Sequence, residues 1–472
     1  MGLSLTELLV EYLRSPLGLD EKAPRFSWQL SSDKKDTLQT AVEIRVREAK
    51  TEEEVWDSGL LSTDVSTGIT YEGKALKPCT AYVVQVEVTD NYGRKAVAET
   101  VFETGFLKKD KSVWEGADWI GAPDFHVAAS ARGVFVLEST FRMKEGSKRA
   151  GVVFGANDFR LLDHNQNEYG LEGENYIRYE INRAGETPVL DIYRVGYAKD
   201  DKKDVPFATV ELDKNVNFDE FHCLKIVVDG DKAFTYLDEK PVDVPETAMG
   251  PMKISGRVLN PRGHNDVLTY PRLNEIGFFA GEGDTAYFKD LTVKNLRTPG
   301  RTFVEETPEK VASIFAELPK EEGCFAVSGT QITKDPSRGA IPMLRSNIPV
   351  RKDAALQRAR LYVTARGIYD VHVNGARITE NLLAPGLTQY DRRMNYQTYD
   401  LTGILKPGNN GIGVALGSGW WCDAQTFVVK NYNYFGDKEA LLAKIVLEFA
   451  DGDREIYTTN PETWKYFGDG PY

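Results

Sequence analysis

The feature that most constrains this fold is a strict alternation of apolar and polar residues in short runs along the whole chain. Clear examples are residues 26–30 (FSWQL), 41–46 (AVEIRV) and 82–88 (YVVQVEV). Such alternation places one face of a strand in a core and leaves the other face in water, as in antiparallel sheets. The sequence therefore predicts an all-β protein built from β-sandwiches.

The strands fall into three groups, which predict three β-sandwich modules. Residues 7–107 have the size of a fibronectin type III-like or immunoglobulin-like sandwich, which holds about seven strands in roughly 100 residues. Residues 125–298 continue with longer strands and predict a jelly-roll, lectin-like module. Residues 340–472 form a third set, a second jelly-roll-like sandwich. A short helix is expected at 308–318.

Turn signals predict two hairpins within these groups. The sequence Asp229-Gly230-Asp231 separates two apolar strands of the middle group, and Asn374-Gly375 follows a strand of the third group. Both are strong hairpin signals because Asn-Gly and Asp-Gly adopt the positive φ angles of a tight turn.

Charge and cysteine content exclude several classes of function. The chain of 472 residues carries a net charge of -13, which disfavours nucleic acid and anionic membrane surfaces as partners. No apolar run is long enough to span a membrane. The four cysteines are far apart, so neither a zinc site nor a dense disulfide framework is expected.

The two ends bear on localisation and completeness. The start has no basic region followed by an apolar stretch, so the protein is periplasmic or secreted if a signal peptide was removed, and otherwise cytoplasmic. Residues 464–472 (WKYFGDGPY) are rich in aromatic residues, glycine and proline, a composition typical of the interior of a protein. We therefore expect the polypeptide to continue beyond them.

A search for catalytic motifs finds none. There is no HExxH, P-loop, dinucleotide-binding glycine motif or GxSxG elbow, and the five histidines are scattered. A glycosidase needs only two carboxylates, but 71 acidic residues make the choice of any pair arbitrary. No catalytic residue is therefore assigned, no cofactor is required, and whether the chain is an enzyme stays open.

Asn157 and Asp158 form the first candidate binding site. They follow an apolar strand in the segment 154–158 (FGAND). Their oxygens could bind sugar hydroxyls or a hard cation such as Ca²⁺. The alternative is a plain Asn/Asp turn that closes the strand.

Trp420 and Trp421 form the second candidate. They precede the aromatic residues Tyr432, Tyr434 and Phe435. Aromatic rings can stack on the apolar faces of sugars, but they also fill interfaces between modules. Both interpretations remain open.

Several motifs, in order, resemble the non-catalytic N-terminal modules of bacterial α-L-rhamnosidases. The first module carries them at 16–20 (PLGLD), 24–28 (PRFSW), 39–41 (QTA), 56–59 (WDSG) and 102–105 (FETG). The third carries them at 359–369 (ARLYVTARGIY), 373–375 (VNG), 384–386 (APG), 396–400 (YQTYD) and 417–421 (GSGWW). The resemblance covers nearly the whole chain.

The middle module resembles a rhamnose-binding carbohydrate module found in part of that family. The matching segments are 154–158 and 193–197 (YRVGY). The resemblance implies a calcium-associated sugar site at Asn157 and Asp158. Phe159 stands where the family pattern has proline, and this departure puts the affinity of the site for sugar in question.

The family's catalytic (α/α)6 barrel and its Cys-Pro-x-Arg-Asp-Glu-type segment are missing from this sequence. The resemblance implies a chain that binds or positions rhamnose-containing glycans for a catalytic barrel of the same polypeptide, which would hydrolyse terminal α-L-rhamnosides by an inverting mechanism. The chain itself is then expected to be inactive. The alternative is a stand-alone sugar-binding or scaffold protein without a catalytic domain.

The resemblance also predicts that the third sandwich is discontinuous. Trp114, Trp119, Ile120 and Gly121 resemble its opening strand in relatives that lack the middle module. The third module would then comprise residues 112–124 plus 299–472, with the middle module inserted between them and its two ends close together.

Overall fold

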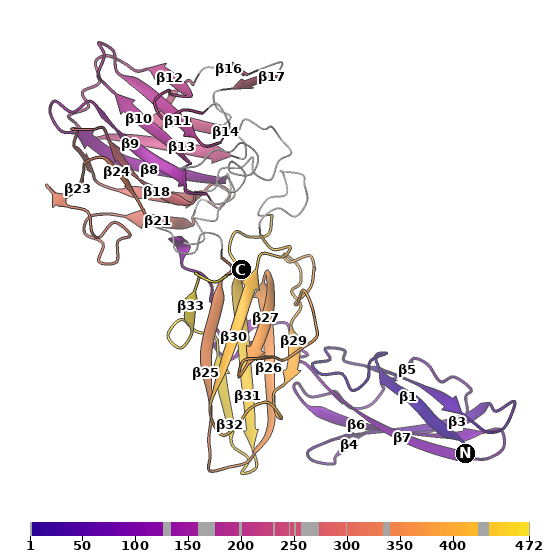
Figure 1. Ribbon diagram of the computed structural model, residues 1–472. Coiled ribbons are helices and arrows are strands. Elements are labelled where there is room, and N and C mark those ends of the chain that lie inside the picture. Colours follow the sequence, from indigo (N-terminus) through magenta and orange to yellow (C-terminus); the bar gives the residue numbers. More distant parts are fainter. Residues whose placement is uncertain are drawn as a thin grey trace.

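The computed structural model of the chain is built almost wholly from β-strands, arranged in three modules (Figure 1). It describes residues 2–125, 134–158, 175–197, 201–229, 232–244, 246–249, 252–255, 273–298, 300–333, 340–422 and 434–471. Three sandwiches are present, so the predicted all-β fold class is confirmed. Within the described residues, no helix is both long and apolar enough to cross a membrane.

The first module is a sandwich of a three-stranded sheet, β1-β2-β5, and a four-stranded sheet, β4-β3-β6-β7. Its strands are β1 (Ser4–Val10), β2 (Arg25–Ser31), β3 (Gln39–Glu48), β4 (Glu54–Leu61), β5 (Ile69–Thr70), β6 (Ala81–Asp90) and β7 (Lys95–Glu103). Strand β6 alternates strictly between buried and half-buried residues, as its sequence predicts. Trp28 fills the centre, and its indole N–H donates to Gln39 Oε1 at 2.9 Å. The 3-10 helix η1 (Lys111–Trp114) follows the module.

The middle module packs a six-stranded sheet, β12-β11-β10-β9-β18-β24, against a larger sheet in which β8 is central. The six strands are β9 (Arg149–Ala156), β10 (Tyr176–Asn182), β11 (Val189–Val195), β12 (Ala208–Glu211), β18 (Glu275–Ala280) and β24 (Thr330–Ile332). The larger sheet comprises β8 (Val134–Met143), β13 (His222–Asp229), β14 (Lys232–Leu237), β15 (Lys240–Val242), β19 (Ala286–Phe288), β20 (Leu291–Asn295), β21 (Thr302–Glu306), β22 (Lys320–Glu321) and β23 (Cys324–Val327). A separate hairpin pairs β16 (Glu246–Met249) with β17 (Met252–Ser255).

Two expectations for the middle module need revision. The chain does not leave this module at 298, because β21, β23 and β24 pair with β20, β19 and β18 of its sheets. Phe315 and Phe325 also lie in its core. The helix expected at 308–318 is instead a series of turns. The predicted hairpin after Asp229 is confirmed by the antiparallel pairing of β13 with β14.

The third module is a sandwich of the five-stranded sheet β28-β27-β30-β25-β33 and the four-stranded sheet β29-β26-β31-β32. Its strands are β25 (Met343–Val350), β26 (Leu356–Arg366), β27 (Ile368–Val373), β28 (Ala376–Arg377), β29 (Gln397–Asp400), β30 (Gly408–Gly417), β31 (Ala440–Phe449), β32 (Arg454–Thr458) and β33 (Lys465–Phe467). Asn374 and Gly375 both have positive φ, 53° and 83°, in the tight turn between β27 and β28. This confirms the second predicted hairpin.

The segment before the middle module lies against the third sandwich. Ile120 forms an isolated antiparallel bridge with Leu441 on β31, and its side chain belongs to the core of the third module. Asp118 N–H donates to Thr459 O at 2.7 Å. The chain thus touches the third sandwich on both sides of the middle module in sequence.

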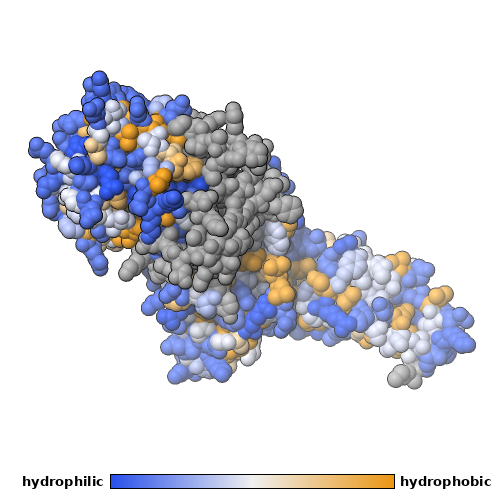
Figure 2. All heavy atoms as spheres, turned by 45° about the horizontal axis from the view of Figure 1, so that its top comes forward, coloured by the Kyte–Doolittle hydropathy of each residue, from blue (hydrophilic) through white to orange (hydrophobic). Residues whose placement is uncertain are grey.

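The first module projects from the other two. Figure 2 shows it extending to one side, with a group of hydrophobic residues on the surface near the junction. The four cysteines, which lie in different parts of the molecule, are all free thiols.

Candidate functional site

Asn157 and Asp158 lie where β9 ends, in the turn that the sequence predicts. Asn157 adopts φ 54°, a left-handed conformation that asparagine tolerates better than most residues. Its backbone N–H donates to Asn175 O at 3.0 Å. Asp158 is buried, and its backbone N–H donates to Asn175 Oδ1 at 2.9 Å.

The turn brings together oxygen-bearing side chains from three strand ends. Asn175 immediately precedes β10, and its Nδ2 donates to Asp158 O at 3.0 Å. Glu275 begins β18, and its Oε2 accepts a hydrogen bond of 2.5 Å from Asn157 Nδ2. Sequence reasoning found Asn157 and Asp158 but missed Asn175 and Glu275, which are 17 and 118 residues away from their partners in the sequence.

These side chains are of the type that binds a hard cation, but they are too few to complete its coordination shell. Asp158, Glu275, Asn157 and Asn175 offer carboxylate and amide oxygens, which Ca²⁺ prefers. Yet no group of three or more His, Cys, Asp or Glu side chains suited to a metal ion occurs among the residues that the structure describes. A calcium ion takes six to eight oxygens, so ligands from elsewhere would have to complete its shell.

Along β10, the face of the six-stranded sheet that points away from the core carries a second polar group. Arg178 and Glu180 lie on this face, because Ile177, Tyr179 and Ile181 point into the core. Alternation alone would place both charged residues in water, but Arg178 is only 8% exposed and Glu180 is fully buried. Sequence reasoning missed this group for that reason.

The Arg178 guanidinium lies between two aromatic rings and next to a carboxylate. Its central carbon is 4.1 Å from the ring centre of Tyr193 and 4.2 Å from that of Phe279. Its Nε is 2.8 Å from Glu180 Oε2. Burial raises the pKa of Glu180, and the neighbouring Arg178 charge opposes that rise. Arg178 and Glu180 thus form an ion pair that is largely removed from water.

Trp421 lies in an aromatic cluster of the third module. Its ring stacks at 6.5 Å from that of Phe435 and meets Tyr390 edge-on at 5.5 Å. The Arg366 guanidinium lies 5.4 Å from the ring centre of Trp421 and 4.6 Å from that of Trp119. Trp420 is half-buried beside it. The rings of Trp421 and Trp119 thus flank one arginine, although the residues are far apart in sequence.

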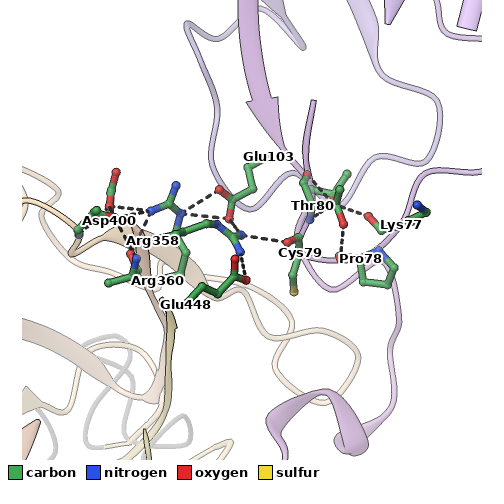
Figure 3. A network of polar contacts seen from close by, with 12 residues as sticks. Lys77, Pro78, Cys79, Thr80, Glu103, Arg358, Arg360, Asp400 and Glu448 are labelled. Carbon is green, nitrogen blue, oxygen red and sulfur yellow. Dashed lines mark hydrogen bonds and ion pairs between the residues drawn. The ribbon is translucent and has the colours of Figure 1, made fainter. Parts of the chain in front are cut away.

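A network of ion pairs joins the first module to the third (Figure 3). Glu103 on β7 is buried and accepts hydrogen bonds from Arg358 Nη2 at 2.5 Å and Arg360 Nε at 2.9 Å. Arg358 also donates to Cys79 O at 2.9 Å and to Glu448 Oε1 at 2.7 Å. These contacts hold the first module to β26 and β31 of the third.

Aromatic packing reinforces this junction. Phe106, at the exit of the first module, stacks on Tyr396 with ring centres 4.6 Å apart and packs on Tyr362 at 4.9 Å. Its backbone N–H donates to the Tyr396 hydroxyl at 2.8 Å. Trp114 of η1 packs edge-on against Phe106 at 5.1 Å. The linker is therefore part of the interface.

Comparisons with known proteins agree with this architecture. The model of the α-L-rhamnosidase N-terminal domain matches residues 354–472, and that of the Rha78A-like N-terminal immunoglobulin domain matches residues 5–108. An α-L-rhamnosidase of Streptomyces avermitilis is 28% identical over 473 residues, which cover 98% of this chain and 41% of that protein. An α-L-rhamnosidase of Formosa agariphila is 32% identical over 130 residues, which cover 27% of this chain and 13% of that protein.

A solved structure supports the fold. The crystal structure of the Streptomyces avermitilis α-L-rhamnosidase complexed with L-rhamnose aligns with a TM-score of 0.50 and 22% identity, covering 99% of this chain and 41% of that one. This chain thus spans about two-fifths of the length of that relative. Residues 5–108 and 354–472 thus match N-terminal domains of α-L-rhamnosidases, as the motifs of the outer modules predicted.

Proposed function

We propose that this chain is the accessory, sugar-binding region of an α-L-rhamnosidase that hydrolyses terminal α-L-rhamnosides by an inverting mechanism. The observation that carries the proposal is the match of both outer modules to N-terminal domains of that family. A catalytic domain of the same polypeptide would then act on rhamnose-containing glycans that these modules bind or position.

The middle module is the proposed sugar-binding part, with its site at Asn157 and Asp158. The supporting geometry is the convergence of Asn157, Asp158, Asn175 and Glu275 from three strand ends. Planar carboxylate and amide groups on a rigid sheet are well suited to bind the hydroxyl groups of one sugar. Phe159, where the sequence departs from the family pattern, lies outside the described residues.

Calcium would assist this binding. Asp158 and Glu275 would contribute carboxylate oxygens, and the amide oxygen of Asn157 a third. Sugar hydroxyls and water would supply the remaining ligands, so metal and sugar should bind cooperatively. A single sugar buries little area, and a dissociation constant of about 0.1–1 mM corresponds to roughly 4–5.5 kcal/mol.

Calorimetry with L-rhamnose, with and without Ca²⁺, tests this site. We expect weak binding that Ca²⁺ strengthens and that Asp158→Ala removes. Asp213→Ala, at an exposed turn of the same module, is the matched control and should bind like the unaltered protein. Equal heats for the Asp158→Ala variant and the control, or no binding at about 10 mM sugar, would leave the segment as a plain turn.

The chain alone should not hydrolyse aryl α-L-rhamnosides. Inversion needs two carboxyl groups about 6.5–9.5 Å apart around a water molecule, and we assign no residue of this chain to either role. Turnover by highly purified protein clearly above that of a heat-treated sample would overturn this. The second candidate function is a sugar-binding or scaffold protein without a catalytic domain. The coding sequence adjoining this chain separates the two, because only the first candidate requires it to encode a catalytic domain.

A further inference from the structure

Arg366, the last residue of β26, is a half-buried cation without a carboxylate partner among the residues that the structure describes. Its Nε is buried and has no hydrogen-bond partner in that part of the chain. Burial lowers the pKa of the guanidinium, and the charge of Arg301 lowers it further. Removing a charge from water without a counter-ion is costly, so this arginine requires an explanation in a chain with 71 acidic residues.

Other cations at the junction between the middle and third modules do have carboxylate partners. Arg301 pairs with Asp437, and its Nη2 lies 3.4 Å from Asp124 Oδ1. Lys438 Nζ lies 3.0 Å from the same oxygen of Asp124. The junction therefore has acidic side chains, but they pair with these cations and leave Arg366 without an ion pair.

The surroundings of Arg366 are aromatic and open to solvent. Its central carbon lies 4.6 Å from the ring centre of Trp119 and 5.4 Å from that of Trp421, and all three side chains are only half-buried. Phe435 stacks on Trp421 and meets Tyr434, which is 67% exposed. A ring attracts the charge through its π face, but it does not accept the in-plane N–H hydrogen bonds that a carboxylate accepts.

The Asn157–Asp158 turn lies at the end of the middle module that faces the third module. Phe154, just before the turn, meets Phe135 edge-on with ring centres 5.7 Å apart. Phe135 pairs with Asn295 between β8 and β20, and Asn295 donates to Asp437 of the third module. The turn and the arginine therefore belong to the same junction between modules.

We propose that Arg366, Trp119 and Trp421 form a subsite for the carboxylate-bearing unit of an acidic glycan, a sugar of the glycuronic acid class. The guanidinium binds the planar carboxylate through paired N–H hydrogen bonds. The exposed parts of the indole rings pack on the C–H surface of the sugar ring. That the ligand is a glycan rests on the proposed function of the chain.

Charge separates this ligand from the alternatives. A metal cation would be repelled by both Arg366 and Arg301, and a neutral sugar would leave the guanidinium without a counter-ion. The net charge of -13 disfavours anions at long range. A carboxylate in contact with Arg366 interacts mainly with that one charge, because salt screens charges separated by more than about 8–10 Å.

Calorimetry on the whole chain, with sodium D-glucuronate and its neutral methyl ester, tests the subsite. We expect the acid to bind weakly and the ester to bind at least about tenfold more weakly, the effect of losing a hydrogen bond between charged groups. Binding of the acid should weaken further as NaCl is raised. Both measurements use the unaltered protein, so neither depends on whether a variant folds.

Arg366→Gln should weaken glucuronate binding by at least about tenfold. Arg345→Gln is the matched control, because it makes the same charge change at an exposed arginine of β25 in the same module and should bind like the unaltered protein. Thermal unfolding checks that both variants are folded. Equal binding by the two variants, or equal binding of the acid and its ester, would overturn the proposal.

Acetate distinguishes a sugar from a carboxylate of another kind. If acetate binds as tightly as glucuronate, the rings contribute no contact to a sugar. The carboxylate that Arg366 binds would then be one from a protein side chain, and the proposed glycan subsite would be wrong. Tighter binding of glucuronate than of acetate supports the subsite.

This subsite and the Asn157–Asp158 site can fail separately. Arg366→Gln should leave L-rhamnose binding unchanged. If glucuronate binds in an Arg366-dependent way while L-rhamnose does not bind, the subsite stands and the turn site is wrong. If L-rhamnose binds and glucuronate does not, the turn site stands and the subsite is wrong.

Discussion

At the scale of single residues, burial at the junction between modules lowers the pKa of Lys444. It lies on β31, almost fully buried, with Nζ donating to Val113 O and 3.3 Å from Glu115 Oε2. The same ammonium lies 4.6 Å from the ring centre of Phe106. Burial lowers the pKa of Lys444, and the Glu115 charge only partly offsets this.

This lowered pKa predicts a pH dependence of stability. Between the lowered pKa and the ordinary value of 10.5, the unfolded chain binds more protons than the folded chain, so stability rises with pH across that window. Each unit of lowering contributes about 1.4 kcal/mol to the rise. Urea unfolding from pH 7 to pH 10 should show that Lys444→Met lacks this rise. Exposed Lys465→Met is the control, and equal slopes for both variants would contradict the prediction.

At the scale of elements, the third sandwich depends on a crossing between its sheets at Gly367. Strand β26 ends at Arg366 in the four-stranded sheet, and β27 begins at Ile368 in the five-stranded sheet. Gly367 has φ 112°, and a Cβ there would lie 2.3 Å from Gly417 O. Only glycine fits, because other residues rarely adopt this conformation and the neighbouring backbone is too close.

Gly367→Ala should therefore destabilise the third module by at least 1–3 kcal/mol, roughly the cost of a strained backbone. Gly413, within β30, provides the comparison, since nothing lies within 4 Å of a Cβ built there. Gly413→Ala should be neutral or slightly stabilising, because glycine in a strand is unfavourable by roughly 0.5–1 kcal/mol. Denaturant unfolding of both variants measures the difference, and equal stabilities would show that the crossing tolerates a side chain.

At the scale of the whole molecule, Glu103 ties the first module to the third. Its carboxylate is shared by Arg358 and Arg360, and all three side chains are largely removed from water. Removing one partner of such a group leaves charges buried without compensation, which costs about 3–5 kcal/mol. The orientation of the first module should therefore depend on this one residue.

Glu103→Gln should uncouple the first module from the rest. Calorimetry should show an earlier, separate transition for the first module, and small-angle scattering should show a wider range of shapes. Glu99→Gln is the control, because Glu99 lies on the same strand and pairs with Arg47 at the surface. An unchanged unfolding profile for Glu103→Gln would mean that aromatic packing around Phe106 suffices to hold the junction.

The sequence by itself determined the all-β class, the three sandwiches, the hairpins at Asp229 and Asn374, and the turn at Asn157. These features follow from alternation and turn chemistry, which act between neighbours in the chain. The family motifs of the first and third modules could also be recognised from the sequence alone.

Only the tertiary structure decided the rest. Glu180 alternates like a residue facing water, yet it is buried, because burial of the second face depends on distant parts of the chain. Phe279 reaches Arg178 from about 100 residues away in sequence through strand pairing, and β24 joins the middle module beyond the expected boundary at 298. Contacts of this range leave no periodic signal in a single sequence, since each depends on which strands pair and which faces meet.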